Sequence, residues 1–491
     1  TNDRSDEYGG SLKNRIRLVK ELIEETKEAV AGKAAVATRF SVDLQEPESY
    51  DAFGLLADLP DLWDLTVNDY SIEMGNSRFV KEGSLVSSIS AAKSLTKKPV
   101  VAVGRFTSPD KMAELLRAGS QDLIGAARPS IADPFLPLKI SEGRIEDIRE
   151  CIGCNICYAH DSLGVPIRCT QNPTMGEEWR FGWHPEKIKK KKSPKRFLVV
   201  GAGPSGLEAA RVLGEQGNKV ILAEATRNLG GRVIKESNLL GLAEWRRVSD
   251  WRITQINKLP NIEIYRESEL VANDVTELNV DFVMIATGAK WAEDAVGRHS
   301  DTGFETTDKN MIIGAERILN GEKIDAECIV IYDDDHYYIG SVMALELAKR
   351  GHKVVLVTPA GRACSWGKYT DEQVPSNLAL YDANVKVVTN KTIINVGQGT
   401  AEAKCIYSSE VTAIKCDAII PLTRRIPSVD LYNSLATSID NECKPSIIKI
   451  GDADAPSHIA AAIYSGYRSA IEFRKKFSSS EFYGRRENKL I

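Results

Sequence analysis

Four cysteines in one short stretch are the residues of this chain whose spacing most clearly indicates chemistry. They lie in the segment CIGCNICYAHDSLGVPIRC with the spacing C-x2-C-x2-C-x11-C, as Cys151, Cys154, Cys157 and Cys169. Three closely spaced thiolates and one distant thiolate are typical ligands of a [4Fe-4S] cluster. The spacing therefore predicts a redox centre held by these four side chains.

Two other uses of these cysteines stay open. Four thiolates also suit a closed structural zinc site, although zinc modules usually divide their ligands into two separated pairs. Disulfide bonds would require an oxidising compartment, and nothing in the sequence indicates one. Iron–sulfur ligation is the reading that the triplet favours.

The composition is that of an ordinary globular protein. The chain has 491 residues, of which 43% are hydrophobic and 27% are charged, and its formal net charge is -4. At roughly 150 residues per domain, about three domains are expected. Nucleic-acid binders usually carry a basic face, and a membrane-spanning helix needs an apolar run of about 20 residues. The sequence shows neither pattern, so we expect no nucleic-acid partner and no membrane.

The remaining cysteines bear on the compartment. They are five in number and scattered: Cys328, Cys364, Cys405, Cys416 and Cys443. An odd number in mostly apolar contexts predicts buried free thiols, hence a reducing compartment, and we expect a cytoplasmic protein. The chain opens at Thr1 in a polar segment without an initiator Met, so we expect further sequence before it.

Short apolar strands alternate with helices before the cysteine run. Strands are expected at residues 34–40, 62–67, 99–103 and 122–124, separated by helices near 49–59, 85–95 and 109–116. This alternation predicts an α/β fold with a parallel sheet. Four such units would make half of a barrel, and a small open sheet is the alternative.

Three arginines stand at the ends of these predicted strands. Arg39 ends the first strand, Arg105 follows the third and Arg128 follows the fourth. A TIM barrel has its active site at the carboxyl ends of its strands and often binds phosphate there, and guanidinium groups pair well with phosphate. A surface salt bridge would explain any one arginine, but three together favour a flavin-binding site. The small residues beside them would let the phosphate approach the backbone: Gly104, Gly125, Ala126 and Ala127.

These segments resemble the old yellow enzyme-type FMN barrels. Residues 2–15 are similar to the N-x-R-x-D-x-Y-G-G-S-x-x-N-R signature of that family, and VGRFTSP and GAARPSIADPF resemble its two phosphate-binding strand ends. With the cysteine run, the chain resembles the C-terminal two-thirds of the trimethylamine dehydrogenase group, which includes dimethylamine and histamine dehydrogenases. The resemblance implies that the N-terminal barrel strands precede Thr1. It also implies that Arg39 lies against the flavin pyrimidine edge, where it would stabilise negative charge on the reduced ring.

The resemblance further implies an active-site aspartate shortly before a G-P-S-R-F-like segment. The matching stretch here, NDYSIEMGNSRF, is shorter and offers Asp69 and Glu73 as candidate catalytic residues. A loop carboxylate without a catalytic role is the alternative for each.

A dinucleotide-binding pattern follows the cysteine run. A strand expected at 196–200 leads directly into GAGPSG, then a helix, a second strand and an acid. In this setting the glycines admit a pyrophosphate to the helix N-terminus, and the acid can accept hydrogen bonds from the ribose hydroxyls. The predicted site residues are Gly201, Gly203, Gly206 and Glu224. A resemblance to flavoprotein disulfide reductases adds Gly231 and Asp452, the latter in GDADAP.

A second strand–helix–strand frame has lost its glycines. Asp335 and Tyr337 stand at two of the three glycine positions, beside Asp333 and Asp334, and Thr358 replaces the ribose-binding acid. Three carboxylates would repel a pyrophosphate. We therefore expect this frame to bind no pyridine nucleotide.

The fold class that follows is α/β: the C-terminal half of a TIM barrel, an iron–sulfur segment, and two Rossmann-like domains of the flavoprotein disulfide reductase type. The expected boundaries are 1–145 for the partial FMN-binding barrel, 146–193 for the [4Fe-4S] segment and linker, 194–305 with 445–491 for the ADP- or FAD-binding domain, and 306–444 for the degenerate NAD(P)-binding-like domain.

The resemblance implies an iron–sulfur flavoprotein oxidoreductase that dehydrogenates a small amine at FMN, by N-demethylation or deamination. Electrons would pass through the [4Fe-4S] cluster to an electron-transferring flavoprotein, with ADP (or FAD) in the first nucleotide site, and we expect a homodimer. The alternatives are an NAD(P)H-dependent enoate or 2,4-dienoyl-CoA reductase and a non-catalytic electron-transfer fragment. The cysteine spacing favours the amine dehydrogenases, because dienoyl-CoA reductases resemble C-x2-C-x3-C.

Overall fold

The computed structural model describes residues 2–177, 183, 188–438 and 445–473. The chain divides into two compact units, Thr1–Gly153 and Cys154–Ile491, and the division falls inside the cysteine run. Cys443 lies outside the described residues. Among the residues described, the helices are all too short or too polar to cross a membrane.

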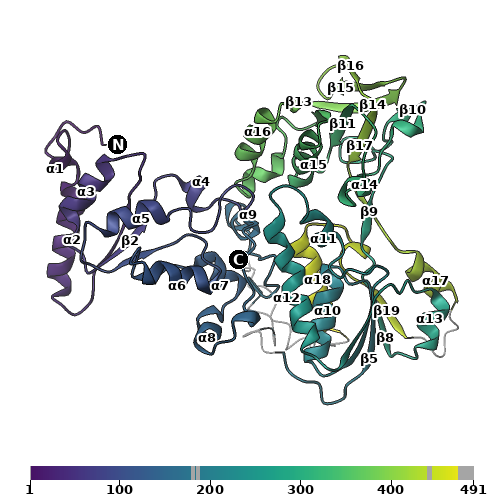
Figure 1. The fold of residues 1–491 in the computed structure, drawn as a ribbon, viewed down its shortest axis with the longest axis horizontal. Helices are drawn as coiled ribbons and strands as arrows, with labels where there is room; N and C mark the ends of the chain where they lie inside the picture. Colours follow the sequence, from purple (N-terminus) through teal and green to yellow (C-terminus); the bar gives the residue numbers. More distant parts are fainter. Residues whose placement is uncertain (1, 178–182, 184–187, 439–444, 474–491) are drawn as a thin grey trace, which may run out of the picture. The chain divides into compact units, whose positions relative to one another are not determined.

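The first unit is built on one parallel sheet, drawn in purple and blue in Figure 1. Its strands lie in the order β1-β2-β3-β4, so each strand pairs with the next one along the chain. Winding in one direction is the order of a barrel, whereas a doubly wound sheet reverses its order. The strands are β1 (Ala37–Ser41), β2 (Leu62–Thr66), β3 (Val100–Ala102) and β4 (Leu123–Ile124).

Helices accompany these strands as the alternation predicts. They are α1 (Leu12–Arg15), α2 (Arg17–Val30), α3 (Glu48–Leu56), α4 (Tyr70–Glu73), α5 (Val86–Lys93), α6 (Pro109–Arg117), α7 (Ala127–Ala132) and α8 (Leu136–Ser141). Phe53 of α3 packs against Trp63 of β2 with ring centroids 4.9 Å apart, and both rings are fully buried. The Trp63 indole N–H donates to the carbonyl oxygen of Ala57 at 2.9 Å, so the ring is buried without losing its hydrogen bond.

The second unit contains a five-stranded parallel sheet in the order β19-β8-β5-β6-β7. Strands β6 and β7 extend from β5 in one direction and β8 and β19 in the other, so the sheet is doubly wound with its switch point between β5 and β8. The strands are β5 (Arg196–Val200), β6 (Lys219–Ala223), β7 (Ile262–Tyr265), β8 (Phe282–Ile285) and β19 (Ser446–Lys449). Strand β19 thus returns to β8 from far along the chain.

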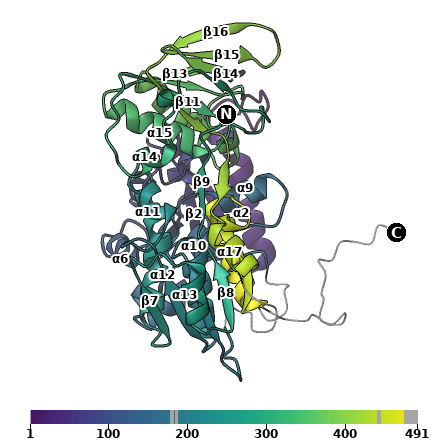
Figure 2. The same ribbon diagram turned by 90° about the vertical axis from the view of Figure 1, so that its right-hand side faces the viewer.

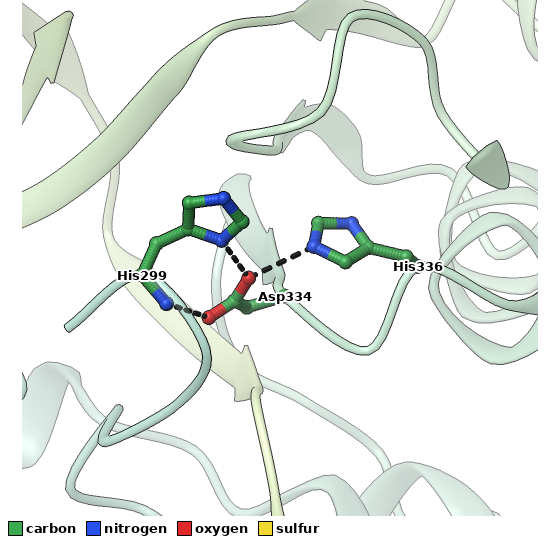
Figure 3. Close-up of side chains that lie close together, drawn as sticks. All are labelled: His299, Asp334 and His336. Atoms are coloured by element: carbon green, nitrogen blue, oxygen red, sulfur yellow. Dashed lines mark hydrogen bonds and ion pairs between the residues drawn. The ribbon is translucent and has the colours of Figure 1, made fainter. Parts of the chain in front are cut away.

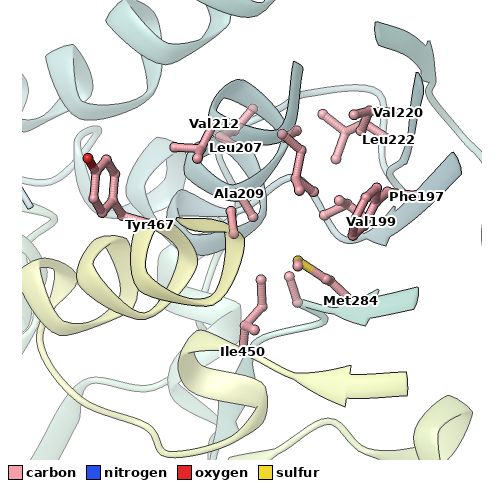
Figure 4. Close-up of a cluster of buried hydrophobic side chains, with 14 of the residues drawn as sticks. Phe197, Val199, Leu207, Ala209, Val212, Val220, Leu222, Met284, Ile450 and Tyr467 are labelled. Atoms are coloured by element: carbon pink, nitrogen blue, oxygen red, sulfur yellow. The ribbon is translucent and has the colours of Figure 1, made fainter. Parts of the chain in front are cut away.

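Helices cover this sheet and bury its core. Figure 4 shows Leu207, Ala209 and Val212 of α10 in one buried cluster with side chains of β5 and β6 and with Tyr467 of α18, and Ala209 lies against α18. The helices of this part are α9 (Ile156–Ser162), α10 (Pro204–Glu215), α11 (Arg232–Glu236), α12 (Arg247–Asn257), α13 (Ala272–Glu277), α17 (Asp430–Ser438) and α18 (Ile459–Ile471). Eleven consecutive positions of α10, residues 204–214, are buried, and most of them are small or apolar. The two charged residues among them, Glu208 and Arg211, pair with each other.

The inserted residues form a second nucleotide-type sheet with the order β13-β12-β11-β17. Its strands are β11 (Cys328–Asp333), β12 (Lys353–Val357), β13 (Lys386–Val388) and β17 (Ala418–Leu422), and its helices are α14 (Ala315–Leu319), α15 (Tyr338–Lys349) and α16 (Gln373–Asp382). All pairs are parallel, and the order reverses between β11 and β17. This reversal is again a switch point.

Two smaller sheets complete the second unit. Figure 2 shows β14, β15 and β16 side by side, and β10 pairs with β14 at the edge of that sheet. Their bounds are β10 (Glu305–Thr306), β14 (Lys391–Gly397), β15 (Thr400–Cys405) and β16 (Val411–Lys415). Strands β9 (Ala289–Trp291) and β18 (Arg425–Pro427) form an antiparallel pair.

The prediction of buried thiols is only partly correct. Cys364 and Cys416 are buried, but Cys328 and Cys405 are partly accessible. Both partly accessible residues lie at strand ends, where the sheet no longer covers the side chain.

Candidate functional site

Two loops at the carboxyl edge of the first sheet carry the predicted flavin residues. Gly104 follows β3 and Gly125 follows β4, and since these strands are parallel neighbours the two loops lie at the same edge. A Cβ atom at Gly104 would lie 2.6 Å from the Phe106 ring, and one at Gly125 would lie 2.8 Å from Val103. A side chain at either position would collide with these neighbours, so glycine is required. Ala126 and Ala127, which follow Gly125, carry only methyl groups, so the backbone of this loop is accessible to a ligand.

Arg105 is buried and its backbone is in the left-handed region, with φ of 54°. Its guanidinium group donates to the carbonyl oxygen of Val80 at 3.0 Å. The same group lies against Gly153, where an added Cβ would be 2.9 Å from Arg105 Nη1. Left-handed backbone in a non-glycine residue costs about 1 kcal/mol or more and is found mainly at functional sites. The Arg105 side chain thus lies beside the backbone of the cysteine run at Gly153.

Arg128, at the start of α7, is also buried but faces a different segment. Its guanidinium group donates to the carbonyl oxygens of Glu73 at 2.9 Å and of Met74 and Gly75 at 3.1 Å each. Arg128 thus fixes the loop after α4. Phosphate binding by Arg105 and Arg128 stays a prediction.

Arg39 on β1 meets two carboxylates. Its guanidinium group lies 3.3 Å from Asp64 of β2 and 2.5 Å from Glu73. Partial burial lowers the pKa of Arg39, but the hydrogen bond and charge of Glu73 and the charge of Asp64 outweigh it, and the net shift is upward. Asp64 was not among the predicted site residues, because its contact with Arg39 depends on the pairing register of β1 and β2.

The two candidate catalytic carboxylates have different surroundings. Asp69 caps α4, accepting hydrogen bonds from the Ser71 backbone N–H at 2.9 Å and the Ser71 hydroxyl at 2.6 Å. This contact is a helix N-cap and explains an aspartate there without any catalysis. Glu73 is the candidate that the structure brings to Arg39.

The cysteine run bends twice in a short distance. Gly153 has φ of 62° and Asn155 has φ of 56°, and α9 with Cys157 begins directly afterwards. The N–H of Gly153 donates to Cys151 Sγ at 3.4 Å, and within the second unit Cys154 Sγ lies 3.1 Å from the Thr170 hydroxyl. Hydrogen bonds to cysteine sulfurs help to set the potential of iron–sulfur clusters. Four thiol side chains are the donor set that a [4Fe-4S] cluster takes, and cluster binding by these cysteines stays a prediction.

The first nucleotide-type loop has the close approaches that its glycines predict. A Cβ at Gly206 would lie 1.9 Å from the Gly201 carbonyl oxygen, and one at Gly231 would lie 2.9 Å from Gly203 Cα. Glu224 accepts from the backbone N–H of Ala202 at 2.8 Å, so the loop itself orients the carboxylate. A carboxylate oxygen has two lone pairs, which leaves capacity for ribose hydroxyls.

Two arginines that the sequence did not point to hold Asp452. Arg425 Nη1 lies 2.6 Å from Asp452 Oδ2, and Arg232 Nε lies 3.5 Å from the same oxygen. Burial and the positive charge of Arg232 lower the pKa of Arg425. For Arg232, the negative charges of Asp452 and Glu236 outweigh the effect of burial, so its pKa is raised. Arg232 follows the predicted Gly231, which could have suggested it, but Arg425 stands in no recognisable motif.

The loop between β11 and α15 is occupied by its own acids. Asp333 is fully buried and its Oδ1 accepts from the His336 N–H at 3.0 Å. A Cβ at Gly340 would lie 2.5 Å from Asp333 Oδ2, so this carboxylate fills the space above the start of α15. Burial and the charge of Asp335 raise the pKa of Asp333 to about 7. This geometry supports the expectation that a pyrophosphate does not bind here.

Comparison with known families defines the class of protein. Residues 1–147 match the NADH:flavin oxidoreductase / NADH oxidase family, and residues 173–318 match the pyridine nucleotide-disulphide oxidoreductase family. The chain is thus an FMN-dependent oxidoreductase that combines a flavin barrel with a FAD/NAD-type nucleotide domain, and the predicted fold class is confirmed.

Individual relatives define the group more narrowly. The chain is 36% identical over 517 residues to dimethylamine dehydrogenase from Hyphomicrobium sp. (strain x), covering 96% of this chain and 69% of the relative. The chain belongs to the trimethylamine/dimethylamine dehydrogenase-type group, as the motifs predicted.

Solved structures agree with this assignment. Histamine dehydrogenase from Rhizobium sp. 4-9 matches with a TM-score of 0.92 and 44% identity, covering 97% of this chain and 71% of that chain. The 6-hydroxypseudooxynicotine amine oxidase from Pseudomonas geniculata N1 matches with a TM-score of 0.91 and 39% identity, covering 96% and 72%.

Proposed function

We propose that this enzyme oxidises a small amine at FMN. The observation that carries the proposal is the similarity, over 96% and 97% of the chain, to a dimethylamine dehydrogenase and a histamine dehydrogenase. The reaction would remove a hydride equivalent from the carbon next to nitrogen. Water then adds to the resulting imine and releases an aldehyde and a smaller amine.

The residues of the first unit would hold and polarise the flavin. The bare backbone after β3 and β4, at Gly104 and Gly125–Ala127, suits a phosphate, with Arg105 and Arg128 supplying positive charge nearby. When bound, FMN supplies a two-electron acceptor. Arg39 is oriented by Asp64 and Glu73 and would stabilise negative charge on the reduced ring.

Cys151, Cys154, Cys157 and Cys169 would hold a [4Fe-4S] cluster. Their spacing and the hydrogen bonds to Cys151 Sγ and Cys154 Sγ support this assignment. A cluster of this kind supplies single-electron transfer, which suits a separate electron-transferring flavoprotein as acceptor. Gly201, Gly203, Gly206, Glu224, Gly231 and Asp452 would bind ADP or FAD in the first nucleotide site.

A reductase fed by NAD(P)H is the competing function. Cinnamate reductase from Clostridium sporogenes is 26% identical over 96% of this chain, so the scaffold also occurs in reductases. The β11–α15 loop distinguishes the two, because Asp333 fills the place of a pyrophosphate. We therefore assign the reducing equivalents to the substrate rather than to a pyridine nucleotide.

The test is anaerobic reduction of the full-length holoenzyme in a stopped-flow spectrometer. Flavin absorbance should bleach rapidly with dimethylamine, histamine or a related small amine, and only slowly with NADH or NADPH. Bleaching by NAD(P)H as fast as by any amine would overturn the proposal in favour of the reductase. An EPR spectrum of the reduced protein without an iron–sulfur signal would remove the cysteine assignment while leaving the amine reaction intact.

A further inference from the structure

Three side chains of the second unit converge on one point, as Figure 3 shows. Asp334 and His336 come from the loop after β11, and His299 comes from the segment between β9 and β10. His299 Nδ1 lies 2.7 Å and His336 Nε2 lies 2.9 Å from the same carboxylate oxygen, Asp334 Oδ1. One ligand atom from each residue lies within 4.8 Å of the other two.

This cluster lies at the switch point of the second nucleotide-type sheet. Strand β11 pairs with β12 on one side and β17 on the other, and the N–H groups of Asp334 and Asp335 both donate to Leu422 at the end of β17. Open α/β sheets bind their ligands at such points, outside the carboxyl ends of the strands. Asp333 fills the space where the pyrophosphate of a nucleotide would lie, but the switch point itself remains suited to a ligand.

Backbone contacts around Asp334 determine the orientation of its carboxylate. The His299 N–H donates to Asp334 Oδ2 at 3.0 Å, and a Cβ at Gly297 would lie 2.5 Å from the same oxygen. His336 is in the left-handed region with φ of 68°. Oδ2 is thus fixed by the backbone, and Oδ1 faces both imidazole rings.

A further contact orients the His336 ring. Its Nδ1 lies 3.4 Å from the hydroxyl oxygen of Thr358, a fully buried residue directly after β12. A metal-binding histidine usually donates its other ring N–H to an oxygen acceptor, which fixes the tautomer. In the metal-bound site, Nδ1–H of His336 would face Thr358 and the lone pair of Nε2 would point at the ion.

We propose that His299 Nδ1, Asp334 Oδ1 and His336 Nε2 form a binding site for a divalent transition-metal ion. Two imidazoles and one carboxylate form a ligand set used for zinc and for other late first-row metals. Zinc lies ~2.0–2.2 Å from such atoms, so its ligands are ~3.4 Å apart in a tetrahedral arrangement. His336 Nε2 and His299 Nδ1, now 2.9 and 2.7 Å from Asp334 Oδ1, would need to move away from it by about 0.5 and 0.7 Å.

The proton balance of binding is simple. To bind the metal, His299 Nδ1 and His336 Nε2 must each offer a lone pair, so the ring N–H of each imidazole must lie on the other nitrogen. In His336 this nitrogen faces Thr358, and in His299 it belongs to a side chain that is 38% exposed. Exposure of His299 also leaves room for a water molecule as fourth ligand. The ion would join the 292–304 segment to the β11–α15 loop and take the place of the lost dinucleotide.

The test measures zinc in the full-length holoenzyme. Wild type, His299→Ala and the control His352→Ala are equilibrated with Zn²⁺, desalted and analysed for metal content per chain. His352 lies in the same sheet region but contacts the Ala326 carbonyl outside the cluster. Wild type and the control should each retain one more zinc per chain than His299→Ala. Equal zinc content in wild type and His299→Ala would overturn the proposal, whatever the cysteines bind.

A second variant tests the outer contact. Thr358→Val keeps the shape of the side chain and should weaken zinc binding about 10- to 100-fold. The melting temperature measured without zinc should change little in His299→Ala, because that side chain is partly exposed. Zinc should raise the melting temperature of wild type and not that of His299→Ala. A zinc-induced rise of the same size in both proteins would contradict the site.

Discussion

At the scale of single residues, several buried charges stabilise loops of the first unit. Arg128 binds three successive carbonyl oxygens after α4 and so determines where Glu73 stands beside Arg39. The planar fork of arginine can donate several hydrogen bonds at once, which the single ammonium of lysine does not reproduce. The position of a candidate catalytic carboxylate thus depends on a residue that never touches it.

Arg128→Lys should therefore loosen this loop. Each hydrogen bond from a charged group contributes about 1.5–3 kcal/mol, so amides of residues 69–77 should exchange with deuterium at least about tenfold faster, as measured by mass spectrometry. The control is Arg117→Lys on α6, an exposed position, where exchange should be unchanged. Equal protection of the 69–77 segment in both variants would contradict this role.

The ionisation of His458 should affect the stability of the second unit. It caps α18 by accepting the Ala461 N–H on Nδ1 at 3.1 Å, which requires an unprotonated nitrogen. Burial, then the charges of His160 and Arg232, lower the pKa of His458 to about 4. The unfolded chain takes up its proton near pH 6.5, so the folded state binds fewer protons between pH 6.5 and pH 4.

The stability contributed by neutral His458 is thus complete above about pH 6.5 and declines as pH falls toward 4. The loss should approach about 3 kcal/mol at pH 4. His458→Asn keeps a good N-cap without a titrating group, so its urea midpoint should fall less over this pH range. Identical pH dependence in wild type and His458→Asn would show that His458 is not responsible.

At the scale of elements, a buried ion network connects the segment after Cys169 to the nucleotide domain. Arg252 of α12 donates to Glu208 of α10 at 2.7 Å and to the side-chain and backbone oxygens of Gln171 at 2.9 Å each. Arg252 and Glu208 are both fully buried. Arg211 also pairs with Glu208, so Arg252 is one of two buried cations that compensate this carboxylate.

Arg252→Met should lower the free energy of unfolding by less than the about 3–5 kcal/mol of a buried charge left unpaired, because Arg211 still pairs with Glu208. Because Gln171 is two residues from Cys169, the variant should also lose iron more rapidly when a chelator is added. The matched control is Arg246→Met at the start of the same helix, where the pair with Asp250 is exposed and contributes less than about 1 kcal/mol. Similar losses of stability in the two variants would count against the network.

At the scale of the whole molecule, local patterns predicted the elements well and the contacts between them poorly. The strand expected at 62–67 is β2 (Leu62–Thr66), because an apolar run bounded by polar residues is a local signal. The spacing of the glycines in the first nucleotide loop also predicted close backbone contacts, and the structure has such contacts, because they form within a single turn of the chain.

Contacts between segments that are distant in the sequence could not be predicted from local sequence patterns. Arg425 meets Asp452, and His299 meets Asp334 and His336, only because separate loops end at the same place in the fold. The sequence did locate Asp333–Asp335 as a departure from the nucleotide pattern. It could not show that His299 arrives beside them, because that depends on the path of the chain between β9 and β10.

The return of β19 to β8 has a consequence for the order in which the protein folds. The first nucleotide sheet cannot acquire its last strand until the ribosome has made residues 446–449, well after the other four strands have emerged. Closing so long a loop as random coil would be slow. The β9–β18 ladder, with Ala289 opposite Pro427, joins the two ends of the insertion. An insertion that folds first would therefore shorten the loop that β19 must close from the whole stretch between β8 and β19 to residues 428–445, which follow β18.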